Sequence, residues 1–505
     1  MSSLSKNIFF NLLGQLLLLI LGFVAVKYIF RQLGHDALGI IYFTATVNAL
    51  LCAVMEMGLC STSVKEVSSH YNSEPGYIRD MLRTFSLFYW AAYALLALAV
   101  YFLAPAIVHR WIILDSMDGV TAIAVLRILG IASLAGLLNS FYTSLFRGLQ
   151  RMELNNTIDV ITTGLQQFGT VFILAFNGNL FHVVYWLAAC YGLKLLAYIV
   201  FSAHFFTFHS LLPGYSRSVM ERVFPFASKM MYVSIVSAIH MQIDKVIVSK
   251  LLPVALFGYY GFAYGSVAKG TLIAGSISQA AFPSFSALSG DNDRSTLMVQ
   301  YRKLQDLVCL SLVPIYAAIS FAVLPLFSFL LDTEAAQLLL LPTALLCLGF
   351  YLNGTVTVPY VFSLAVGKPE IATRINLYAL LFVLPVAVFL IYFLSLVGAA
   401  LAWVFYHLFY YIYGIPKICR DCLNISVWEW YFHVIRIIII AGLIYGIAWI
   451  ISANIDFQSI SSLAACYSFA SIAFLQATWF IVGQPLRGSL KTFFKTLRIK
   501  VVEFV

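Results

Sequence analysis

Residues 433–453 read HVIRIIIIAGLIYGIAWIISA, twenty-one residues that include a single charged side chain, Arg436. A bilayer core about 30 Å thick is crossed by a helix of roughly 20 apolar residues, so this stretch has the properties of a transmembrane helix. The remainder of the 505-residue chain continues the pattern, with 62% hydrophobic and 10% charged residues. Soluble domains carry roughly 25% charged residues. The composition therefore excludes soluble, secreted and disordered classes and predicts a polytopic membrane protein.

Continuous apolar runs along the chain predict an all-α fold with fourteen transmembrane helices. The intervals between the runs are short, so we expect no catalytic domain outside the membrane. The first run is too long for a cleaved signal peptide and is interpreted as the first span. The predicted spans are 7–31, 37–63, 82–108, 120–146, 157–178, 182–206, 223–250, 255–285, 305–331, 335–365, 371–395, 398–416, 433–453 and 459–482.

The basic residues indicate the orientation. Of the thirty Lys and Arg residues, twenty-two fall on the side of the two termini, while Arg31, Arg110 and Lys250 fall on the other side. Cytoplasmic loops of membrane proteins are enriched in Lys and Arg, so both termini are predicted to be cytoplasmic. The net charge of +9 therefore reflects topology and indicates no nucleic-acid partner.

An internal duplication relates spans 1–6 to spans 7–12. Six spans is an even number, so the two copies enter the membrane from the same side, as parallel repeats that form two six-helix lobes. Such an architecture favours a carrier that opens to alternate sides over a channel. The anchors, at offsets of 217 to 220, are 37–43 with 256–262, Pro105 with Pro325, Glu153 with Glu370, and Trp186 with Trp403.

The repeat predicts the domain organisation. The N-terminal lobe covers 1–210, the C-terminal lobe 211–416, two appended spans 417–486, and a basic tail 487–505. Basic and apolar residues alternate in the tail at helical spacing, which suits an amphipathic helix on anionic lipid. A solvated basic tail that only enforces topology is the alternative.

Ionisable groups inside spans are costly and therefore indicate function. Basic groups outnumber acidic ones, which favours an anionic head group such as a phosphate or diphosphate. Snorkelling to the interface or structural pairing is the alternative for each base except Lys269, which falls in the middle of its span among small residues. The candidate substrate-binding residues are Lys27, Arg31, Arg127, Lys194 and Lys269.

The acidic groups suggest ion coupling or gating. His240 and Asp244 are four residues apart, so both can lie on one helix face and exchange a proton near neutral pH. A hydrogen-bonded structural pair is the alternative. Glu56 and Asp159 are the other acidic groups within spans, and Glu56 joins the coupling or gating candidates.

Enzyme chemistry is not indicated. The pair Cys419 and Cys422 has no second pair or His at zinc spacing. The chain has no P-loop, and no nucleophile with a base can be argued from spacing. We therefore expect no enzymatic activity, no metal and no cofactor other than a coupling proton or sodium ion.

Several short motifs, taken in their order and spacing, resemble those of a known family. They are RQLG at 31–34 with ALG at 37–39, EMGL at 56–59 followed by Lys65, QIDK at 242–245 with GYY at 258–260, and AFPSFS at 281–286. Together they resemble the Wzx-type flippase branch of the multidrug/oligosaccharidyl-lipid/polysaccharide exporter superfamily. Glu56 stands where that family usually has aspartate, and Lys245 where arginine is common.

This resemblance implies a flippase in the bacterial inner membrane that works by alternating access. It would move an undecaprenyl-diphosphate-linked repeat unit of O-antigen, capsule or a related glycan from the cytoplasmic to the periplasmic leaflet. Counter-movement of protons or sodium, and glycan polymerase and chain-length machinery as partners, are further expectations. A peptidoglycan-precursor flippase, a multidrug or cation exporter of the same superfamily, and a non-transporting scaffold of glycan assembly are the alternatives.

Overall fold

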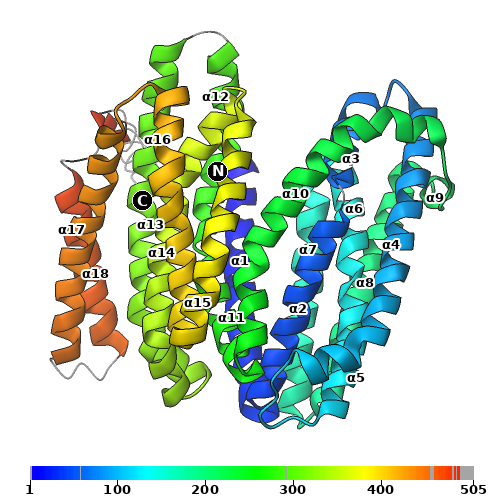
Figure 1. Ribbon diagram of the computed structural model, residues 1–505, viewed down its shortest axis with the longest axis horizontal. Coiled ribbons are helices and arrows are strands. Elements are labelled where there is room, and N and C mark those ends of the chain that lie inside the picture. Colours follow the sequence, from blue (N-terminus) through cyan, green and yellow to red (C-terminus); the bar gives the residue numbers. More distant parts are fainter. Residues whose placement is uncertain are drawn as a thin grey trace. The chain divides into compact units, whose positions relative to one another are not determined.

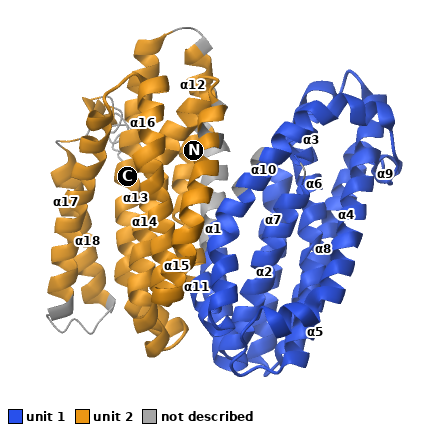
Figure 2. Cartoon of the chain, in the orientation of Figure 1, with its two compact units in different colours: residues 1–261 blue, residues 262–505 orange. Residues whose placement is uncertain are grey.

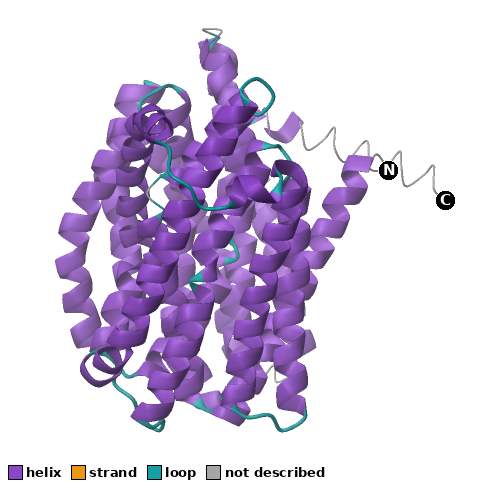
Figure 3. Ribbon diagram, turned by 90° about the vertical axis from the view of Figure 1, so that its right-hand side faces the viewer, coloured by secondary structure: helices purple, strands orange, loops and turns teal. Residues whose placement is uncertain are grey.

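The computed structural model describes residues 3–56, 58–290, 293–454, 460–479, 481, 483–484 and 486–488. Helices make up nearly all of this part of the chain, and no strand occurs in it (Figure 3). One isolated bridge, between Ile113 and Pro253, is its only β-type pairing. The all-α prediction is confirmed. The tail predicted as an amphipathic helix lies outside the described residues from 489 onward.

The helices pack into two compact units, residues 1–261 and 262–505 (Figure 2). Figure 1 labels the helices along the chain. Unit 1 contains α1 (Ser3–Leu33), α2 (His35–Met55), α3 (Leu59–His70), α4 (Pro75–Arg110), α5 (Gly119–Ser133), α6 (Ala135–Gly148), α7 (Met152–Ala175), α8 (Leu180–Phe206), α9 (Phe208–Leu211), α10 (Arg217–Leu251) and the start of α11 (Val254–Ala268).

Unit 2 contains the end of α11 and the remaining helices. These are α12 (Thr271–Gly290), α13 (Arg294–Leu330), α14 (Thr333–Ala365), α15 (Pro369–Phe409), the π-helical turns η1 (Tyr410–Gly414) and η2 (Cys419–Leu423) on either side of α16 (Ile415–Ile418), α17 (Val427–Asn454) and α18 (Ile460–Trp479). Within this unit α17 packs against α18, and both pack against α13.

Ten helical segments among the described residues are long and apolar enough to cross a membrane. One of them, Arg374–Leu423, contains a break at Ser395, whose φ of 52° is not helical. Such a segment can cross the membrane twice, so the number of segments is not the number of membrane crossings. The chain is an integral membrane protein, and the number of fourteen spans stays a prediction.

Helix boundaries recur at the spacing of the predicted duplication. Helices α4 and α13 begin 219 residues apart, at Pro75 and Arg294, and end 220 apart, at Arg110 and Leu330. Helices α2 and α11 also begin 219 residues apart. Packing divides the chain at 261/262, whereas the repeat divides it at 210/211. The division into lobes by the repeat stays a prediction.

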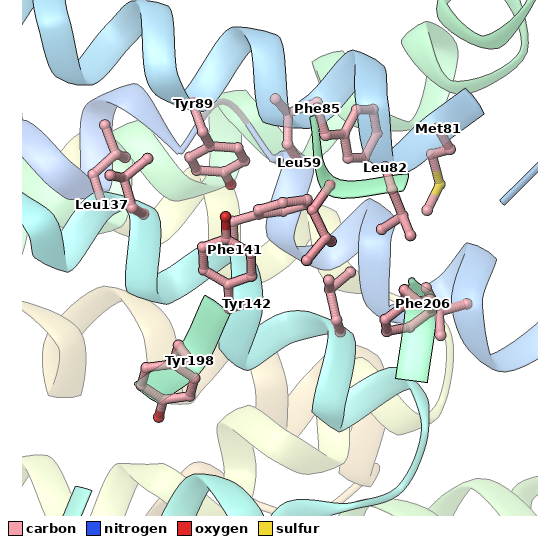
Figure 4. Packing of buried hydrophobic residues seen from close by; sticks show 14 of the residues in the cluster. Leu59, Met81, Leu82, Phe85, Tyr89, Leu137, Phe141, Tyr142, Tyr198 and Phe206 are labelled. Carbon is pink, nitrogen blue, oxygen red and sulfur yellow. The ribbon is translucent and has the colours of Figure 1, made fainter. Parts of the chain in front are cut away.

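The core of unit 1 is an aromatic-rich cluster between α3, α4, α6 and α8 (Figure 4). Tyr89 of α4 stacks on Phe141 of α6 with ring centroids 5.0 Å apart. Gly148 lets α6 approach α3, because a Cβ there would lie 2.7 Å from the Cβ of Val67. Close van der Waals packing of these large side chains holds one face of α6 in place, which leaves its opposite face free to line a pocket.

At the opposite end of unit 1, the start of α2 is fastened by Asp36. This carboxylate is 2% exposed, and its Oδ2 accepts the backbone N–H groups of Asp115, Ser116 and Met117 at 3.0, 2.7 and 2.9 Å. Three charge-assisted hydrogen bonds compensate the burial of the charge. The loop between α4 and α5 is therefore bound to the N-terminus of α2.

Two glycines at equivalent positions of the predicted repeat lie in direct contact. A Cβ on Gly39 of α2 would lie 2.0 Å from the carbonyl oxygen of Val254, and one on Gly258 of α11 would lie 2.8 Å from the nitrogen of Gly39. The His35 ring is hydrogen-bonded to the hydroxyl of Tyr259 beside them. The two backbones approach so closely here that only glycine fits at either position.

Candidate functional site

A polar pocket of about 460 Å³ lies inside unit 1. Its volume falls within the range of 300–1,000 Å³ typical of ligand sites. Four charged side chains line it, together with hydroxyl, amide and thiol groups, in a chain whose membrane segments are otherwise apolar. The lining residues are Glu56, Cys60, Ser61, Val64, Gly136, Asn139, Ser140, Thr143, Ser144, Arg147, Asp159, Tyr191 and Lys194.

The pocket lies where the helix that would form the second span is broken. Helix α2 ends at Met55, and α3 resumes at Leu59 after Gly58, whose φ of 69° is left-handed. Glu56 stands at this break. Its N–H donates to the carbonyl oxygen of Cys52, and its carbonyl oxygen accepts the N–H of Leu59, both at 2.9 Å. Irregular backbone at membrane depth occurs where it lines a cavity.

A second interruption separates α5 from α6 at Leu134. Asn48 of α2 donates to the carbonyl oxygen of Gly130 at 3.3 Å and also hydrogen-bonds to the hydroxyl of Ser133. The Gly130 carbonyl oxygen also accepts the N–H of Leu134 at 3.3 Å, so the amide adds a further hydrogen bond at the interruption. Because Asn48 belongs to α2, it also ties the two interrupted helices together next to the pocket.

The polar lining follows one stripe of α6. The residues recur at positions i, i+3, i+4, i+7, i+8 and i+11, which places them on one face of the helix: Gly136, Asn139, Ser140, Thr143, Ser144 and Arg147. The opposite face carries Leu137, Phe141 and Leu145, which belong to the aromatic-rich core. The helix is therefore amphipathic inside the membrane protein, with its polar face toward the pocket.

An ion pair joins α7 to α8 at one side of the pocket. Lys194 Nζ lies 2.8 Å from Asp159 Oδ1, and the hydroxyl of Tyr198 donates to the same oxygen at 3.1 Å. The side chains of Lys194 and Asp159 are 28% and 48% exposed, so both reach the open space of the pocket. Such a pair can exchange its internal partner for a charged ligand.

Across the pocket, Glu56 interacts electrostatically with Arg147. The thiol of Cys60, one turn after Glu56, lies 3.0 Å from the hydroxyl of the buried Tyr89. The four charges of the lining are therefore two bases and two acids, of which Lys194 and Asp159 form an ion pair. The lining is not simply cationic, and it offers both signs of charge to a ligand.

Asn139 provides a hydrogen-bond acceptor without a donor. The residue is 6% exposed, and its Oδ1 is buried with no hydrogen-bond partner in the described part of the protein. An unmade hydrogen bond of a buried amide costs about 1–3 kcal/mol. A ligand hydroxyl that donates to this oxygen would recover that energy.

Among the candidate substrate-binding residues, Lys194 lines this pocket, whereas Lys27, Arg31 and Arg127 are not among its lining residues. Lys27 is half-buried and Arg31 exposed on α1, one turn apart. The Nε of Arg127 donates to the carbonyl oxygen of Tyr101 at 3.0 Å, and its guanidinium carbon lies 4.3 Å from the centre of that ring. Arg127 is thus bound to α4.

Lys269 lies in the turn between α11 and α12 of unit 2, where its side chain is exposed. Among the coupling candidates, Asp244 is 4% exposed. Its Oδ1 lies 3.2 Å from Lys245 Nζ, and its Oδ2 accepts the hydroxyl of Tyr260 at 2.8 Å. His240 is buried on the same helix, and Glu56 lines the pocket. The coupling and gating roles stay predictions.

Sequence reasoning overlooked the hydroxyl-rich lining. The stripe on α6 is visible in the sequence at 136–147 as polar residues with helical spacing inside an apolar segment, so it could have been found. The pairing of Asp159 with Lys194 could not, because the two residues are far apart in the chain and meet only through the packing of α7 on α8. The described residues contain no group of His, Cys, Asp and Glu able to hold a metal.

Solved structures with the same arrangement of helices are transporters. The chain is similar to a lipid II flippase, MurJ, in an inward closed conformation, with a TM-score of 0.70 and 14% identity over 94% of this chain and 98% of the other. It is also similar to an inward-facing multidrug resistance MATE transporter of the MOP superfamily, with a TM-score of 0.66 and 12% identity over 79% and 94%. The fold is that of a MOP-superfamily transporter.

A family model described as polysaccharide biosynthesis protein matches residues 4–289, which is more than half of the chain. The protein belongs to this polysaccharide biosynthesis family. It is also 21% identical, over 405 residues that make up 79% of this chain and 94% of the relative, to a Shigella flexneri protein named "Putative O-antigen transporter". The predicted family is therefore confirmed.

Proposed function

We propose that the protein is a flippase that moves an undecaprenyl-diphosphate-linked oligosaccharide, a repeat unit of O-antigen or a related glycan, from the cytoplasmic to the periplasmic leaflet. The family match and the similarity to the Shigella flexneri protein support this class of cargo. The observation that carries the proposal is the polar pocket of unit 1, about 460 Å³ in volume and lined by hydroxyl groups and by both signs of charge.

The chemistry of the pocket suits a sugar. Saccharides present many hydroxyl groups that both donate and accept hydrogen bonds, and Ser61, Ser140, Thr143, Ser144 and Tyr191 offer the matching groups. The unpartnered Oδ1 of Asn139 would accept one sugar hydroxyl. A drug site, by contrast, is mostly apolar with few polar groups. The lining thus favours a glycan over an apolar cation.

The diphosphate needs positive charge. Lys194 can turn from its partner Asp159 toward phosphate oxygens, and Arg147 lines the same pocket; both side chains bind phosphate well. Further candidate contacts to the diphosphate are proposed because cations are costly to place inside membrane spans. They are Lys27, Arg31, Arg127 and Lys269. Glu56, Asp244 and His240 are proposed to couple transport to a proton or sodium gradient or to gate it.

Transport by alternating access requires a contact that opens. The close approach of α2 and α11 at Gly39 and Gly258 lies at the end of α2 that the distribution of basic residues predicts to be periplasmic. Separation of these two helices would open that side. Both termini are proposed to be in the cytoplasm of a bacterium and the chain in its inner membrane, with glycan polymerase and chain-length proteins as partners. No enzymatic step is required.

The test is deletion of the gene in its host, with measurement of surface glycan and of lipid-linked intermediates, followed by complementation. Loss of surface glycan with intermediates retained inside, rescued by the wild type and by Arg217→Ala but not by Lys194→Ala, is the expected result. Arg217 is a matched control because it is an exposed base, paired with Glu221 at 2.9 Å and remote from the pocket lining.

The same strain discriminates between the alternatives. Arrest of peptidoglycan synthesis with normal surface glycan would replace the proposal with a peptidoglycan-precursor flippase, whose fold the chain shares over 94% of its length. Unchanged glycan with altered drug tolerance would indicate an exporter. Full rescue by both single variants, Lys194→Ala and Asn139→Ala, would contradict the assignment of the pocket.

A further inference from the structure

A second pocket, of about 310 Å³, lies in unit 2 where α13 and α17 begin and where the chain leaves α18. It is separate from the pocket of unit 1 and beyond the residues that the family model matches. The distribution of basic residues predicts that this end of the helices faces the cytoplasm. The polar side chains that matter below are Arg302, Gln305, Asp306, Glu429, His433 and Arg436.

Both carboxylates of this pocket already have partners. Asp306 is 5% exposed, and its two oxygens bind the Gly483 N–H and His433 Nε2, each at 2.8 Å. At the rim, Arg302 Nη2 donates to Glu429 Oε1 at 3.0 Å. These contacts connect α13 with α17 and with the segment after α18, and they leave no carboxylate available for a further cation.

Arg436 is the charge that remains. It lies nine residues into α17, about 13 Å along the helix from its start. No ion pair among the described residues includes it, its Nε is buried without a hydrogen-bond partner, and its guanidinium carbon lies 5.7 Å from the centre of the Phe432 ring. A guanidinium at this depth is costly unless an anion or a polar group compensates it. Arg302 pairs with Glu429 and His433 faces Asp306, so Arg436 is the charged group of this lining that faces no oppositely charged side chain among the described residues, and it points to an anionic ligand.

Gln305 adds an unused acceptor. Its Nε2 donates to the carbonyl oxygen of Thr355 at 3.0 Å, which orients the amide, and its Oε1 is buried without a donor. The residue is 3% exposed. A ligand that satisfies both Arg436 and Gln305 must combine an anionic oxygen with a hydrogen-bond donor. A phosphodiester next to a hydroxyl group has this combination.

The pocket also continues into an apolar surface. Phe432 lines the pocket and is 71% exposed, and Ile435, Ile439 and Leu443 follow it along one face of α17 at 45%, 55% and 59% exposure. A free phosphate would gain nothing from this surface. A lipid whose head group occupies the pocket would lay an acyl chain on it.

We propose that this pocket binds the head group of an anionic glycerophospholipid such as phosphatidylglycerol. Arg436 and His433 contact the phosphodiester, Gln305 Oε1 accepts a hydroxyl of the head group, and one acyl chain lies on the apolar face of α17 that begins at Phe432. Basic pockets between transmembrane helices at the cytoplasmic side bind anionic head groups in this way. The bound lipid would hold α17 and the segment after α18 against α13, independently of the transported substrate.

The test uses the full-length protein purified in detergent. Native mass spectrometry after addition of phosphatidylglycerol is expected to show one retained lipid, and thermal unfolding is expected to shift upward. Arg436→Gln should bind this lipid at least about tenfold more weakly, because a charge-assisted hydrogen bond is lost. Arg374→Gln is the matched control, since Arg374 is an exposed arginine of unit 2 outside the pocket lining.

Further probes separate the sources of the phosphate. Inorganic phosphate at millimolar concentration should leave the unfolding temperature unchanged, and phosphatidylcholine should be retained less than phosphatidylglycerol. Protection by inorganic phosphate equal to that by lipid would overturn the lipid assignment. If Arg436→Gln does not fold, Phe432→Ala, which changes an exposed side chain, should still weaken retention several-fold. Retention of phosphatidylglycerol equal in the wild type and in either variant would also overturn the proposal.

Discussion

The two pockets of this membrane protein are built from opposite parts of its helices. The pocket of unit 1 lies at interruptions in the middle of helices, where α2 gives way to α3 and α5 to α6. The pocket of unit 2 lies where whole helices begin or end and continues into an exposed apolar surface. The first is lined by hydroxyl groups and by two acids and two bases, and the second has two partnered carboxylates and an arginine that faces no carboxylate.

This difference suggests that the position of a polar group along its helix determines whether it meets cargo or lipid. Groups at interrupted helices deep in the protein can meet a cargo that moves through it, because irregular backbone at membrane depth is buried in protein or lines a cavity and does not face lipid. Groups near helix ends meet lipid head groups that remain at the interface. The following predictions test this distinction, in decreasing order of expected effect.

The largest effect is expected from the interruption of the second span. Gly58→Ala introduces a Cβ 2.4 Å from the carbonyl oxygen of Ala227 at a residue with φ of 69°. Strain and overpacking together should destabilise unit 1 by about 2–4 kcal/mol and abolish transport. Thermal unfolding of the purified protein measures this change. Gly192→Ala, at a helical glycine with nothing within 4 Å, is the control, and an equal effect of the two substitutions would contradict the argument.

Breaking the ion pair between α7 and α8 should reduce transport at least about tenfold. Lys194→Ala leaves Asp159 without its cation, and Asp159→Asn leaves Lys194 without its carboxylate. Either change is unfavourable because an unpaired charge is costly to desolvate. If both residues also contact the cargo, the double variant will not recover activity. Recovery of wild-type flipping in proteoliposomes by the double variant would show that the pair is only structural.

Asn139→Ala should weaken cargo binding several-fold and leave stability unchanged or raised, because its Oδ1 makes no hydrogen bond within the protein. The measurement is the concentration dependence of flipping, together with thermal unfolding. The control is Asn155→Ala, whose amide nitrogen donates to the carbonyl oxygen of Thr143 at 3.2 Å and which is absent from the pocket lining. That control should lose stability and keep its cargo affinity. The reverse pattern would contradict the site.

The smallest effect is expected at an exposed ion pair of unit 1. Arg222 donates to both oxygens of Glu74 at 2.7 and 3.1 Å, and this hydrogen bonding holds the pKa of Glu74 below its ordinary value. A lowered carboxyl pKa means that the stabilisation is present at neutral pH and is lost as the pH falls through that pKa. Glu74→Gln should therefore lower the unfolding temperature slightly at pH 7, with the difference disappearing in acid. If the difference in unfolding temperature between the wild type and Glu74→Gln grew in acid, the lowered pKa of Glu74 would be contradicted.

The helical architecture could be predicted because apolar runs alone specify membrane helices. The interruption after Met55 could not, since Cys52, Ala53 and Val54 continue the apolar pattern and only Gly58 indicates a break. Lys269 was predicted within a span and lies in a turn between two helices. In both cases tertiary packing, and not the local sequence, determines the backbone.

The candidate site was predicted in part. Lys194 and Glu56 were identified because isolated charges in spans are conspicuous, and the structure brings both to one pocket. Arg127 was equally conspicuous, yet Tyr101 binds its guanidinium against α4. Arg436 was counted with the basic residues of the cytoplasmic side, although it falls within the predicted span 433–453, and it lies inside α17. Charge alone indicates that a residue matters, whereas its partner on another helix decides whether the residue faces a pocket.

Protection of the unit 1 pocket by its cargo tests the central claim most directly. Ser140→Cys in a Cys60→Ser background places one reactive thiol in the lining. Its rate of modification by a membrane-impermeant maleimide is measured with and without undecaprenyl-diphosphate carrying one repeat unit. We expect the lipid-linked glycan to slow modification several-fold, while undecaprenyl phosphate without sugar protects less. Equal modification rates with and without the glycan would contradict the assignment of this pocket.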